Sequence, residues 1–301
     1  MSLERLIHDN PLTLSLSRKV LAVCYSLAPK MSVKIVYRLR LGRWPDLKNP
    51  QTFTEKIQWM RLYDHDPLKT KLADKYLVRE WVTEKIGDEY LIPLLGVWDS
   101  FDEIDFDTLP EQFVLKANHG SGWNIIVRDK SQFDKREARK MCEKWLKTNY
   151  GRANFEPHYI LILPKLIAEK YIENSDGNLY DYKVHCFGGK AVYIQYIGDR
   201  ASHTTKEAFF DTEWNLMPFT YTYPRYEVPI SKPDNLKELL SLSETLAIHF
   251  PYVRVDFYVL NDGSFRFGEL TFTPAAGLDR WEPSAYDLKL GKLIPLQVEE
   301  L

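Results

Sequence analysis

The sequence has 301 residues, of which 45% are hydrophobic and 14% aromatic, enough to bury a sizeable core in one large domain or two modest ones. Its 40 basic and 42 acidic residues leave a net charge of -2, which argues against the basic surface that sequence-independent nucleic-acid binding needs, so we expect no nucleic-acid partner. Cys24, Cys142 and Cys186 lack the spacing of a zinc site or a disulfide framework, and this cysteine usage suits a reducing compartment.

The N-terminal region is apolar and basic, but it does not resemble a membrane span. No run approaches the roughly 18 to 20 apolar residues of a spanning helix, and the start lacks the basic region of a signal peptide. Residues 12–40 mix apolar side chains with six lysines and arginines, and such a segment either packs on its own domain or lies on an anionic membrane. We therefore expect a cytoplasmic protein, with peripheral contact at the inner face of the membrane through residues 12–40 as the alternative.

The first third of the chain is mainly helical. Apolar residues recur at helical spacing over Thr54–Tyr63 and over Thr70–Ile86, and Gly87 ends the second helix. A short buried strand over Tyr90–Val97 follows, and the acidic stretch Asp99–Asp107 forms a surface connection.

From Phe113 onward the pattern favours strands. The expected strands are Phe113–Asn118, Trp123–Val127, Leu166–Ile172, Tyr180–Phe187, Lys190–Ile197, Tyr252–Leu260 and Ser264–Thr271. Gly188-Gly189 favours a tight hairpin, and the expected helices are Lys130–Tyr150 and Asp234–His249. The fold class is therefore α+β with mostly antiparallel sheets.

A glycine loop follows a lysine in the first of these hairpins. Lys116 lies in an apolar strand directly before the loop His119-Gly120-Ser121-Gly122. Glycines let backbone N–H groups approach phosphate oxygens, and a neighbouring lysine neutralises phosphate charge. The loop lacks the ending of a Walker A sequence, and a strand follows it where a dinucleotide fingerprint needs a helix. A phosphate-binding loop between antiparallel strands and an ordinary hairpin with a solvated lysine both remain open.

The last hairpin carries the most informative residues. If Asp262-Gly263 forms a two-residue type I′ turn, Asp256 pairs with Glu269 and Arg254 pairs with Thr271 across the strands. Two carboxylates placed opposite each other repel unless a cation bridges them, and Mg²⁺ prefers carboxylate, phosphate and water oxygens. The alternatives are a surface ion cluster neutralised by Arg254, and a bulged turn that offsets the pairing by one residue.

As an ordered set, these motifs resemble the ATP-grasp superfamily. Lys116 with His-Gly-Ser-Gly, Ala168-Glu169-Lys170-Tyr171-Ile172, Arg254-Val255-Asp256 and Gly268-Glu269-Leu270 carry the resemblance. More closely, segments such as NPQTFTEKIQWM, FVLKANHGSGWNIIV and RVDFYVLNDGSFRFGELTFTP are similar to the TupA-like family of teichuronopeptide and surface-polysaccharide synthesis. The resemblance covers about residues 40–280, and each motif alone is weak.

The resemblance implies roles for individual residues. It implies that Lys75 and Lys116 contact ATP phosphates, that Ser121 and Gly122 close over them, and that Glu169, Lys170, Tyr171 and Ile172 form the hinge that binds adenine. Asp181 and Lys183 fall where ribose or phosphate contacts are expected. Asp256 and Glu269 match the metal ligands, and Arg254 matches the arginine that stabilises the transferred phosphoryl group. Thr271 stands where many relatives carry an asparagine ligand, so a second metal is in doubt, although threonine is usual in this branch.

The resemblance also implies an architecture of two α+β subdomains with ATP held between them, beside a helical N-terminal region. We expect a helical N-terminal region and first α/β unit over residues 1–110, a lid subdomain over 111–168 and a C-terminal subdomain with the metal site over 169–301.

The implied activity is a ligase that uses ATP and Mg²⁺ to join a carboxylate, such as a uronic acid, to an amine through an acylphosphate. The residues themselves leave open a sugar kinase, a glycosyltransferase and a non-catalytic nucleotide-binding module, of which the kinase is the strongest rival.

His119 and His185 are candidates for a general base, with an ordinary structural role as the alternative. Aromatic residues around Tyr193, Tyr196, Trp214, Tyr221 and Trp281 could stack on a sugar ring or simply pack in the core.

Overall fold

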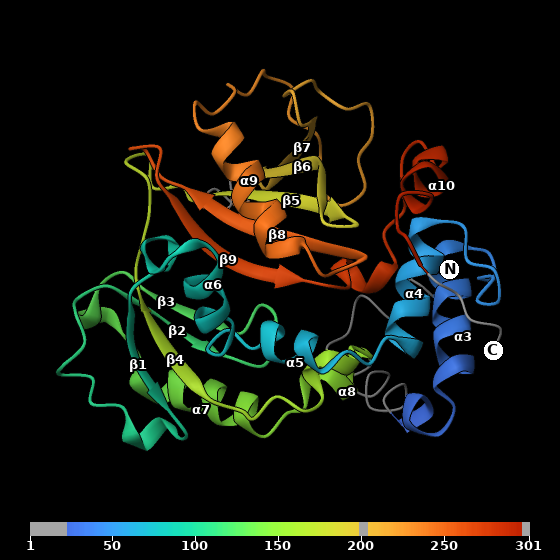
Figure 1. The fold of residues 1–301 in the computed structure, drawn as a ribbon. Helices are drawn as coiled ribbons and strands as arrows, with labels where there is room; N and C mark the ends of the chain where they lie inside the picture. The colour runs from blue at the N-terminus through green and yellow to red at the C-terminus, as the bar shows by residue number, and fades with distance from the viewer. Residues whose placement is uncertain (1–22, 199–203, 297–301) are drawn as a thin grey trace.

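A computed structural model describes residues 23–198 and 204–296 of the chain, so the part of the expected membrane-contact segment that falls on residues 12–22 lies outside the described residues. The described residues form an α+β fold with two antiparallel sheets, as the sequence predicts (Figure 1). The first sheet has the strand order β1-β4-β2-β3 and the second has the order β7-β6-β5-β8-β9. None of the described helices is long and apolar enough to cross a membrane.

The strands and helices have the following bounds. The strands are β1 Leu94–Trp98, β2 Phe113–Ala117, β3 Asn124–Val127, β4 Leu166–Lys170, β5 Tyr180–Phe187, β6 Lys190–Gly198, β7 Lys206–Asp211, β8 Tyr252–Val259 and β9 Phe265–Thr271. The helices are α3 Pro29–Leu41, α4 Phe53–Tyr63, α5 Pro67–Ala73, α6 Val78–Ile86, α7 Lys135–Leu146, α8 Tyr150–Asn154, α9 Leu236–Ala247 and α10 Ala285–Gly291. Short 3-10 turns lie at η1 Asp88–Tyr90, η2 Phe101–Glu103, η3 Lys130–Gln132, η4 Pro157–Tyr159 and η5 Pro274–Gly277. Strand β7 was not expected from the sequence.

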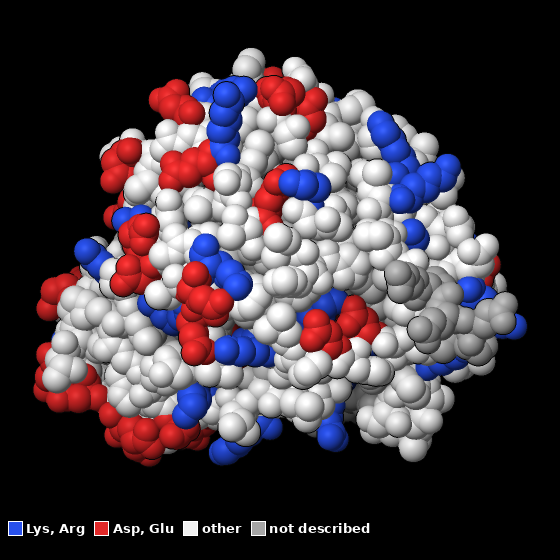
Figure 2. All heavy atoms as spheres, in the orientation of Figure 1, with Lys and Arg blue, Asp and Glu red and all other residues white. Residues whose placement is uncertain are grey.

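Three apolar clusters hold the sheets and helices together. One packs the first sheet against α7 and residues 101–109. A second packs one face of the second sheet against α6 and α9, and a third, rich in aromatic residues, joins α4 and α10 to its other face. On the molecular face shown in Figure 2, basic and acidic side chains are interspersed.

The first sheet draws its strands from residues 94–170, so it extends on both sides of the segment 111–168 that we expected to form a subdomain. The connection that follows β4, residues 171–179, carries the chain from the first sheet to the second. Tyr171 and Ile172, which the family resemblance assigns to a hinge, begin this connection.

The register of the β8–β9 hairpin contains two compensating shifts. The expected two-residue turn is wrong, because Leu260 pairs with Ser264 around a three-residue loop and Phe257 pairs with Phe267. This pairing places Phe265 and Phe267 in the core, where the two-residue turn would have placed Arg266 and Gly268. A bulge at Gly268 then restores the pairing of Asp256 with Glu269 and of Arg254 with Thr271, as expected.

The single helix expected over Thr70–Ile86 is wrong, because the chain breaks between α5 and α6. The Asp74 carboxylate accepts hydrogen bonds from the backbone N–H groups of Tyr76 and Leu77, at 2.8 and 3.2 Å, which stabilises the turn that precedes α6. Asn118, at the end of β2, donates to the same carboxylate at 2.9 Å, and its carbonyl accepts from the Lys75 N–H at 3.1 Å. The break therefore ties Lys75 to the glycine loop of the first sheet.

The turn η5 packs tightly on α4. Gln58 donates hydrogen bonds to the carbonyls of Ala276 and Gly277, at 2.7 and 3.0 Å. Ala275 and Ala276 adopt positive φ angles of 45° and 53°, a strained conformation for residues with a Cβ. Gly277 follows with a φ of +63°, and a Cβ built there would lie 2.6 Å from a methyl carbon of Ile57.

Gly277→Ala is expected to lower the free energy of unfolding by about 2 to 4 kcal/mol, the sum of left-handed strain and steric overlap with Ile57. Gly177→Ala is the matched control, since Gly177 also has a positive φ, +74°, but no neighbouring atom within 4 Å. The Gly177→Ala substitution is expected to lower the free energy of unfolding by about 1 kcal/mol, from backbone strain alone. Denaturant unfolding of both variants measures the difference, and equal losses would contradict the tight packing of η5 on α4.

Candidate functional site

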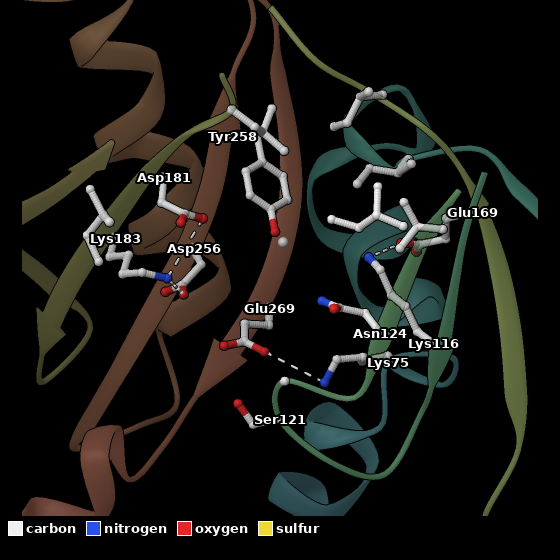
Figure 3. Close-up of a pocket in the computed structure, with 18 of the residues that line it drawn as sticks. Lys75, Lys116, Ser121, Asn124, Glu169, Asp181, Lys183, Asp256, Tyr258 and Glu269 are labelled. Atoms are coloured by element: carbon white, nitrogen blue, oxygen red, sulfur yellow. Dashed lines mark hydrogen bonds and ion pairs between the residues drawn. The ribbon is translucent and has the colours of Figure 1, made fainter. Parts of the chain in front are cut away.

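A cavity of about 630 Å³ lies between the two sheets, and we call it the first cavity. Its walls carry side chains from β2, β3 and β4 on one side and from β5, β8 and β9 on the other. Figure 3 shows the two walls facing each other, with Lys75, Lys116 and Glu169 opposite Asp181, Asp256 and Glu269.

The wall from the second sheet is polar because its strands alternate. On β8, Val253, Val255 and Phe257 are buried in the core, and the alternate residues Arg254 and Asp256 point into the cavity. The bulge at Gly268 turns Glu269 to the same side as Asp256, although Phe265 and Phe267 before it point into the core. The alternation and the bulge thus bring three charged side chains to one surface.

Arg254 is the centre of this wall. Its guanidinium donates two hydrogen bonds of 2.7 Å to the Asp256 carboxylate, and lies 3.4 Å from Glu269. Lys183 on β5 forms a second ion pair with Asp256 and lies 3.9 Å from Asp181. Burial alone would raise the pKa of Asp256, but the charges of Arg254 and Lys183 outweigh it and lower that pKa to about 2. Asp256 is therefore ionised at neutral pH.

Thr271 is the one predicted site residue that does not line the first cavity. Its hydroxyl accepts a hydrogen bond from Arg254 at 3.0 Å and donates one to Glu269 at 3.2 Å. The threonine thus connects the arginine to the second carboxylate, and its side chain lines a neighbouring cavity.

The opposite wall holds a buried ion cluster on the first sheet. Lys116 on β2 pairs with Glu169 on β4, and Arg79 on α6 lies 3.2 Å from the other oxygen of the same carboxylate. Arg79 also donates a hydrogen bond to the Ile92 carbonyl at 2.9 Å. Arg79 was not predicted, because nothing in its sequence context distinguishes it from other helix-surface arginines.

Lys75 extends toward both the glycine loop and the second sheet (Figure 3). Its ammonium donates a 2.6 Å hydrogen bond to the Gly120 carbonyl and lies 3.7 Å from the Glu269 carboxylate. Ser121 and Gly122, at the tip of the loop, are exposed and line the cavity. The loop, the lysine and a carboxylate of the opposite sheet therefore converge at one place.

The end of the cavity beside the hinge is more apolar. Tyr171 and Ile172, which follow Lys170 at the end of β4, line it with Ile92, Val114 and Leu179. The Tyr171 hydroxyl accepts a 2.8 Å hydrogen bond from the Arg128 side chain, and this contact holds the tyrosine in the cavity wall. These side chains give the cavity an apolar surface among its charged residues.

Two groups in the first cavity, Tyr258 and Asp279, were not predicted from the sequence. Tyr258 lies two residues beyond Asp256 on the same face of β8, so strand alternation could have identified it. Asp279 reaches the cavity from a loop, for which the sequence gives no signal, and Tyr221, named above as an aromatic candidate, lines the cavity as well. Burial raises the pKa of the Asp279 carboxyl, Glu207 adds to the effect, and the resulting pKa is about 7.

The two histidines considered as general bases have structural positions instead. Both His119 ring nitrogens have partners at 3.0 Å, the Asn118 side chain and the Trp145 carbonyl. His185 is fully buried beside Tyr252, and burial lowers its pKa well below the ordinary value. Neither histidine lines a described cavity.

The oxygen donors of this site fit Mg²⁺. Asp256 and Glu269 face each other on neighbouring strands, and carboxylates completed by phosphate and water oxygens are the ligands Mg²⁺ prefers. Within the described ranges, no group of three or more His, Cys, Asp or Glu side chains could hold a metal without help. A metal bound here would therefore depend on phosphate oxygens from a nucleotide.

A family model described as TupA-like ATPgrasp matches residues 55–295. The chain belongs to this TupA-like ATP-grasp family. The match includes every predicted site residue, from Lys75 to Thr271. No curated protein matches the chain.

Several solved structures are similar to this TupA-like chain. The L-amino acid ligase from Bacillus licheniformis has 12% identity and a TM-score of 0.48, over 96% of this chain and 62% of that one. N5-carboxyaminoimidazole synthetase from Staphylococcus aureus, complexed with ADP, has 16% identity and a TM-score of 0.41, over 66% and 44%. D-alanine–D-alanine ligase from Bacillus anthracis, complexed with ATP, has 18% identity and a TM-score of 0.41, over 74% and 65%. This chain spans less than two thirds of each of these proteins, and its family assignment rests on the family match.

Proposed function

We propose that the protein is an ATP-dependent carboxylate–amine ligase that forms an amide through an acylphosphate. The observation that carries this proposal is the first cavity, where Asp256, Glu269 and Arg254 on the second sheet face Lys116 on the first sheet and Lys75 from the break between α5 and α6. Paired carboxylates opposite lysines suit a magnesium–triphosphate group, because its negative charge needs both a metal and ammonium groups.

The nucleotide would lie along the cavity from the hinge to Arg254. Adenine would lie against the apolar surface at Tyr171 and Ile172, with the backbone from Glu169 to Ile172 at its edge. Asp181 and Lys183 would contact the ribose or phosphates, and Lys75, Lys116 and the backbone at Ser121-Gly122 would contact the phosphates.

Asp256 and Glu269 would hold Mg²⁺, with the Thr271 hydroxyl beside them, and the metal would neutralise charge on the phosphate oxygens. In the present ion pairs Asp256 contacts Arg254 and Lys183, so binding of the nucleotide would redistribute these cations toward the phosphates. Arg254 would balance charge on the transferred phosphoryl group while keeping its contact with Thr271.

The residues mainly position reactants and stabilise charge. A free carboxylate is a poor acyl donor, because displacement by an amine would have to expel oxide. Transfer of the γ-phosphoryl group from ATP makes an acylphosphate whose leaving group is phosphate, and attack by an amine then gives the amide. No covalent enzyme intermediate is needed for this sequence of steps.

The proposed carboxylate is a uronic acid or another sugar-derived acid in surface-polysaccharide synthesis. This part of the proposal derives from the family resemblance, and no residue of the first cavity selects among carboxylates. A sugar kinase would use the same nucleotide site, and would differ in passing phosphate to a hydroxyl group. A glycosyltransferase would bind a nucleotide sugar and would not consume ATP.

With ATP, Mg²⁺, nucleotide-linked uronic acids and a panel of amines, the purified protein is expected to release ADP and phosphate together only when acid and amine are both present. Glu269→Gln keeps the side-chain size but removes one metal-binding charge, and is expected to lower kcat/KM by about 100- to 1,000-fold. Glu143→Gln, on the exposed face of α7, is the matched control and should retain activity.

Coupled measurement of ADP and phosphate separates the outcomes of this assay. ADP release with a stable phosphorylated sugar and no free phosphate would establish a kinase. Full activity of Glu269→Gln, or no binding of ATP, would contradict the assigned metal and phosphate sites.

We also infer that the protein contacts an anionic membrane surface through residues 23–41. Val23, Leu27, Met31, Ile35 and Leu39 are exposed at intervals of four residues, so each lies next to the following one, in a stripe that winds around the helices formed by 23–27 and α3. Lys30, Lys34 and Arg38 lie beside this stripe, and basic side chains next to an exposed apolar stripe complement anionic headgroups.

Leu27→Glu is expected to weaken binding to vesicles of anionic lipid about tenfold, because it removes apolar contact and adds repulsion. Leu161→Glu is the matched control, since Leu161 is 77% exposed and Leu27 is 81% exposed. Co-sedimentation with anionic and with neutral vesicles measures the effect. Equal binding by the two variants, or no preference for anionic vesicles, would contradict this inference.

A further inference from the structure

A second cavity of about 460 Å³ adjoins the first beside Arg254. Ser121, Arg254, Glu269 and Ala275 line both cavities, so the two meet where the glycine loop approaches the carboxylate pair. No sequence pattern pointed to the residues deeper in this second cavity.

Glu156 is the charged group that distinguishes the second cavity. Its side chain is 12% exposed, and its carboxylate accepts a 2.7 Å hydrogen bond from the Thr273 hydroxyl. The Tyr150 hydroxyl interacts with both Glu156 and Ser121, which connects the carboxylate to the glycine loop.

The cationic group nearest to Glu156 is Arg61, which also lines the second cavity and whose charge acts on the Glu156 carboxylate without a direct ion pair. Arg61 is buried, but its guanidinium donates to the carbonyls of Asn154, Phe155 and Ala276 and to the side chain of Gln58, at 2.7 to 3.0 Å. His158 lies 3.7 Å from Glu156, and burial lowers the pKa of that histidine to about 3, so it is neutral. Across residues 23–198 and 204–296, no lysine or arginine forms an ion pair with Glu156.

A buried carboxylate that makes no direct ion pair with a lysine or arginine keeps much of its desolvation cost, and a bound ammonium group would relieve that cost. A carboxylate substrate would be repelled by Glu156 in the same place, and Arg254 at the junction is the better partner for it. The hydroxyls of Tyr150, Tyr159 and Thr273 add acceptors suited to the N–H groups of an amine.

We propose that the second cavity binds the amine substrate, a small primary amine, and that Glu156 holds its ammonium group beside the junction with the first cavity. The inference rests on the proposed ligase function and names which cavity takes the amine. Burial raises the pKa of the Glu156 carboxyl, which also suits it to accept a proton from the bound ammonium.

The chemical step balances with Glu156 in this role. The ammonium gives one proton to the Glu156 carboxylate, and the resulting amine attacks the acyl carbon of the acylphosphate. The new C–N bond forms as the bond from the acyl carbon to the phosphate oxygen breaks. The second nitrogen proton leaves with phosphate as HPO₄²⁻, and Glu156 returns its proton to water.

Glu156→Gln tests the assignment, with hydroxylamine as a trapping nucleophile. Hydroxylamine is uncharged near neutral pH and reacts with an acylphosphate to give a hydroxamate, so it does not need a group that binds ammonium. We would use the nucleotide-linked uronic acid that gives the most hydroxamate with the unmodified protein, and glycine and ethanolamine as amines.

Glu156→Gln is expected to keep hydroxamate formation within about twofold, while kcat/KM for the amine falls at least 50-fold. Glu143→Gln should keep both reactions. An unchanged rate of amide formation in Glu156→Gln would overturn the assignment and leave the ligase function intact. Equal loss of hydroxamate and amide, with a higher KM for the acid, would overturn it by placing the acid in this cavity. Absence of hydroxamate with the unmodified protein would overturn the ligase function itself, and this inference with it.

Discussion

The facing carboxylates of Asp256 and Glu269 impose the main electrostatic constraint on the fold. Like charges on neighbouring strands repel, and here Arg254, Lys183 and Lys75 compensate them from three different elements. Two of these cations come from the same sheet, and the third comes from the break between α5 and α6. The compensation therefore links the two sheets across the first cavity, and the same cations are available to phosphate groups.

Sequence patterns were sufficient for every described strand except β7 and for the charged wall that β8 and β9 contribute to the first cavity. Strand alternation and the β8–β9 pairing follow from local rules, so Arg254, Asp256 and Glu269 were placed together from the sequence. The predicted turn was wrong because Phe265 and Phe267 need the core more than Arg266 and Gly268 do. The alternation of Phe265, Arg266 and Phe267 was a usable signal for that register, and Gly268 was a signal for the bulge.

Residues that depend on tertiary contacts could not be predicted in the same way. The helix break at Asp74 depends on a side-chain hydrogen bond from Asn118, which is 44 residues away. Arg79 and Glu156 gain their importance from burial beside other charged groups, and neither lies in a distinctive local pattern. Glu156 in particular is recognisable only because a cavity reaches it and no lysine or arginine of the described residues pairs with it.

The central claim is that a carboxylate is activated as an acylphosphate, and the fate of its oxygen atoms tests this most directly. With a uronic acid labelled with ¹⁸O in its carboxyl group, the bridging oxygen of the acylphosphate comes from the acid and leaves with phosphate. Mass spectrometry of the released phosphate is therefore expected to find one ¹⁸O atom for each amide formed. Unlabelled phosphate, or label retained entirely in the sugar product, would contradict the acylphosphate and the ligase function.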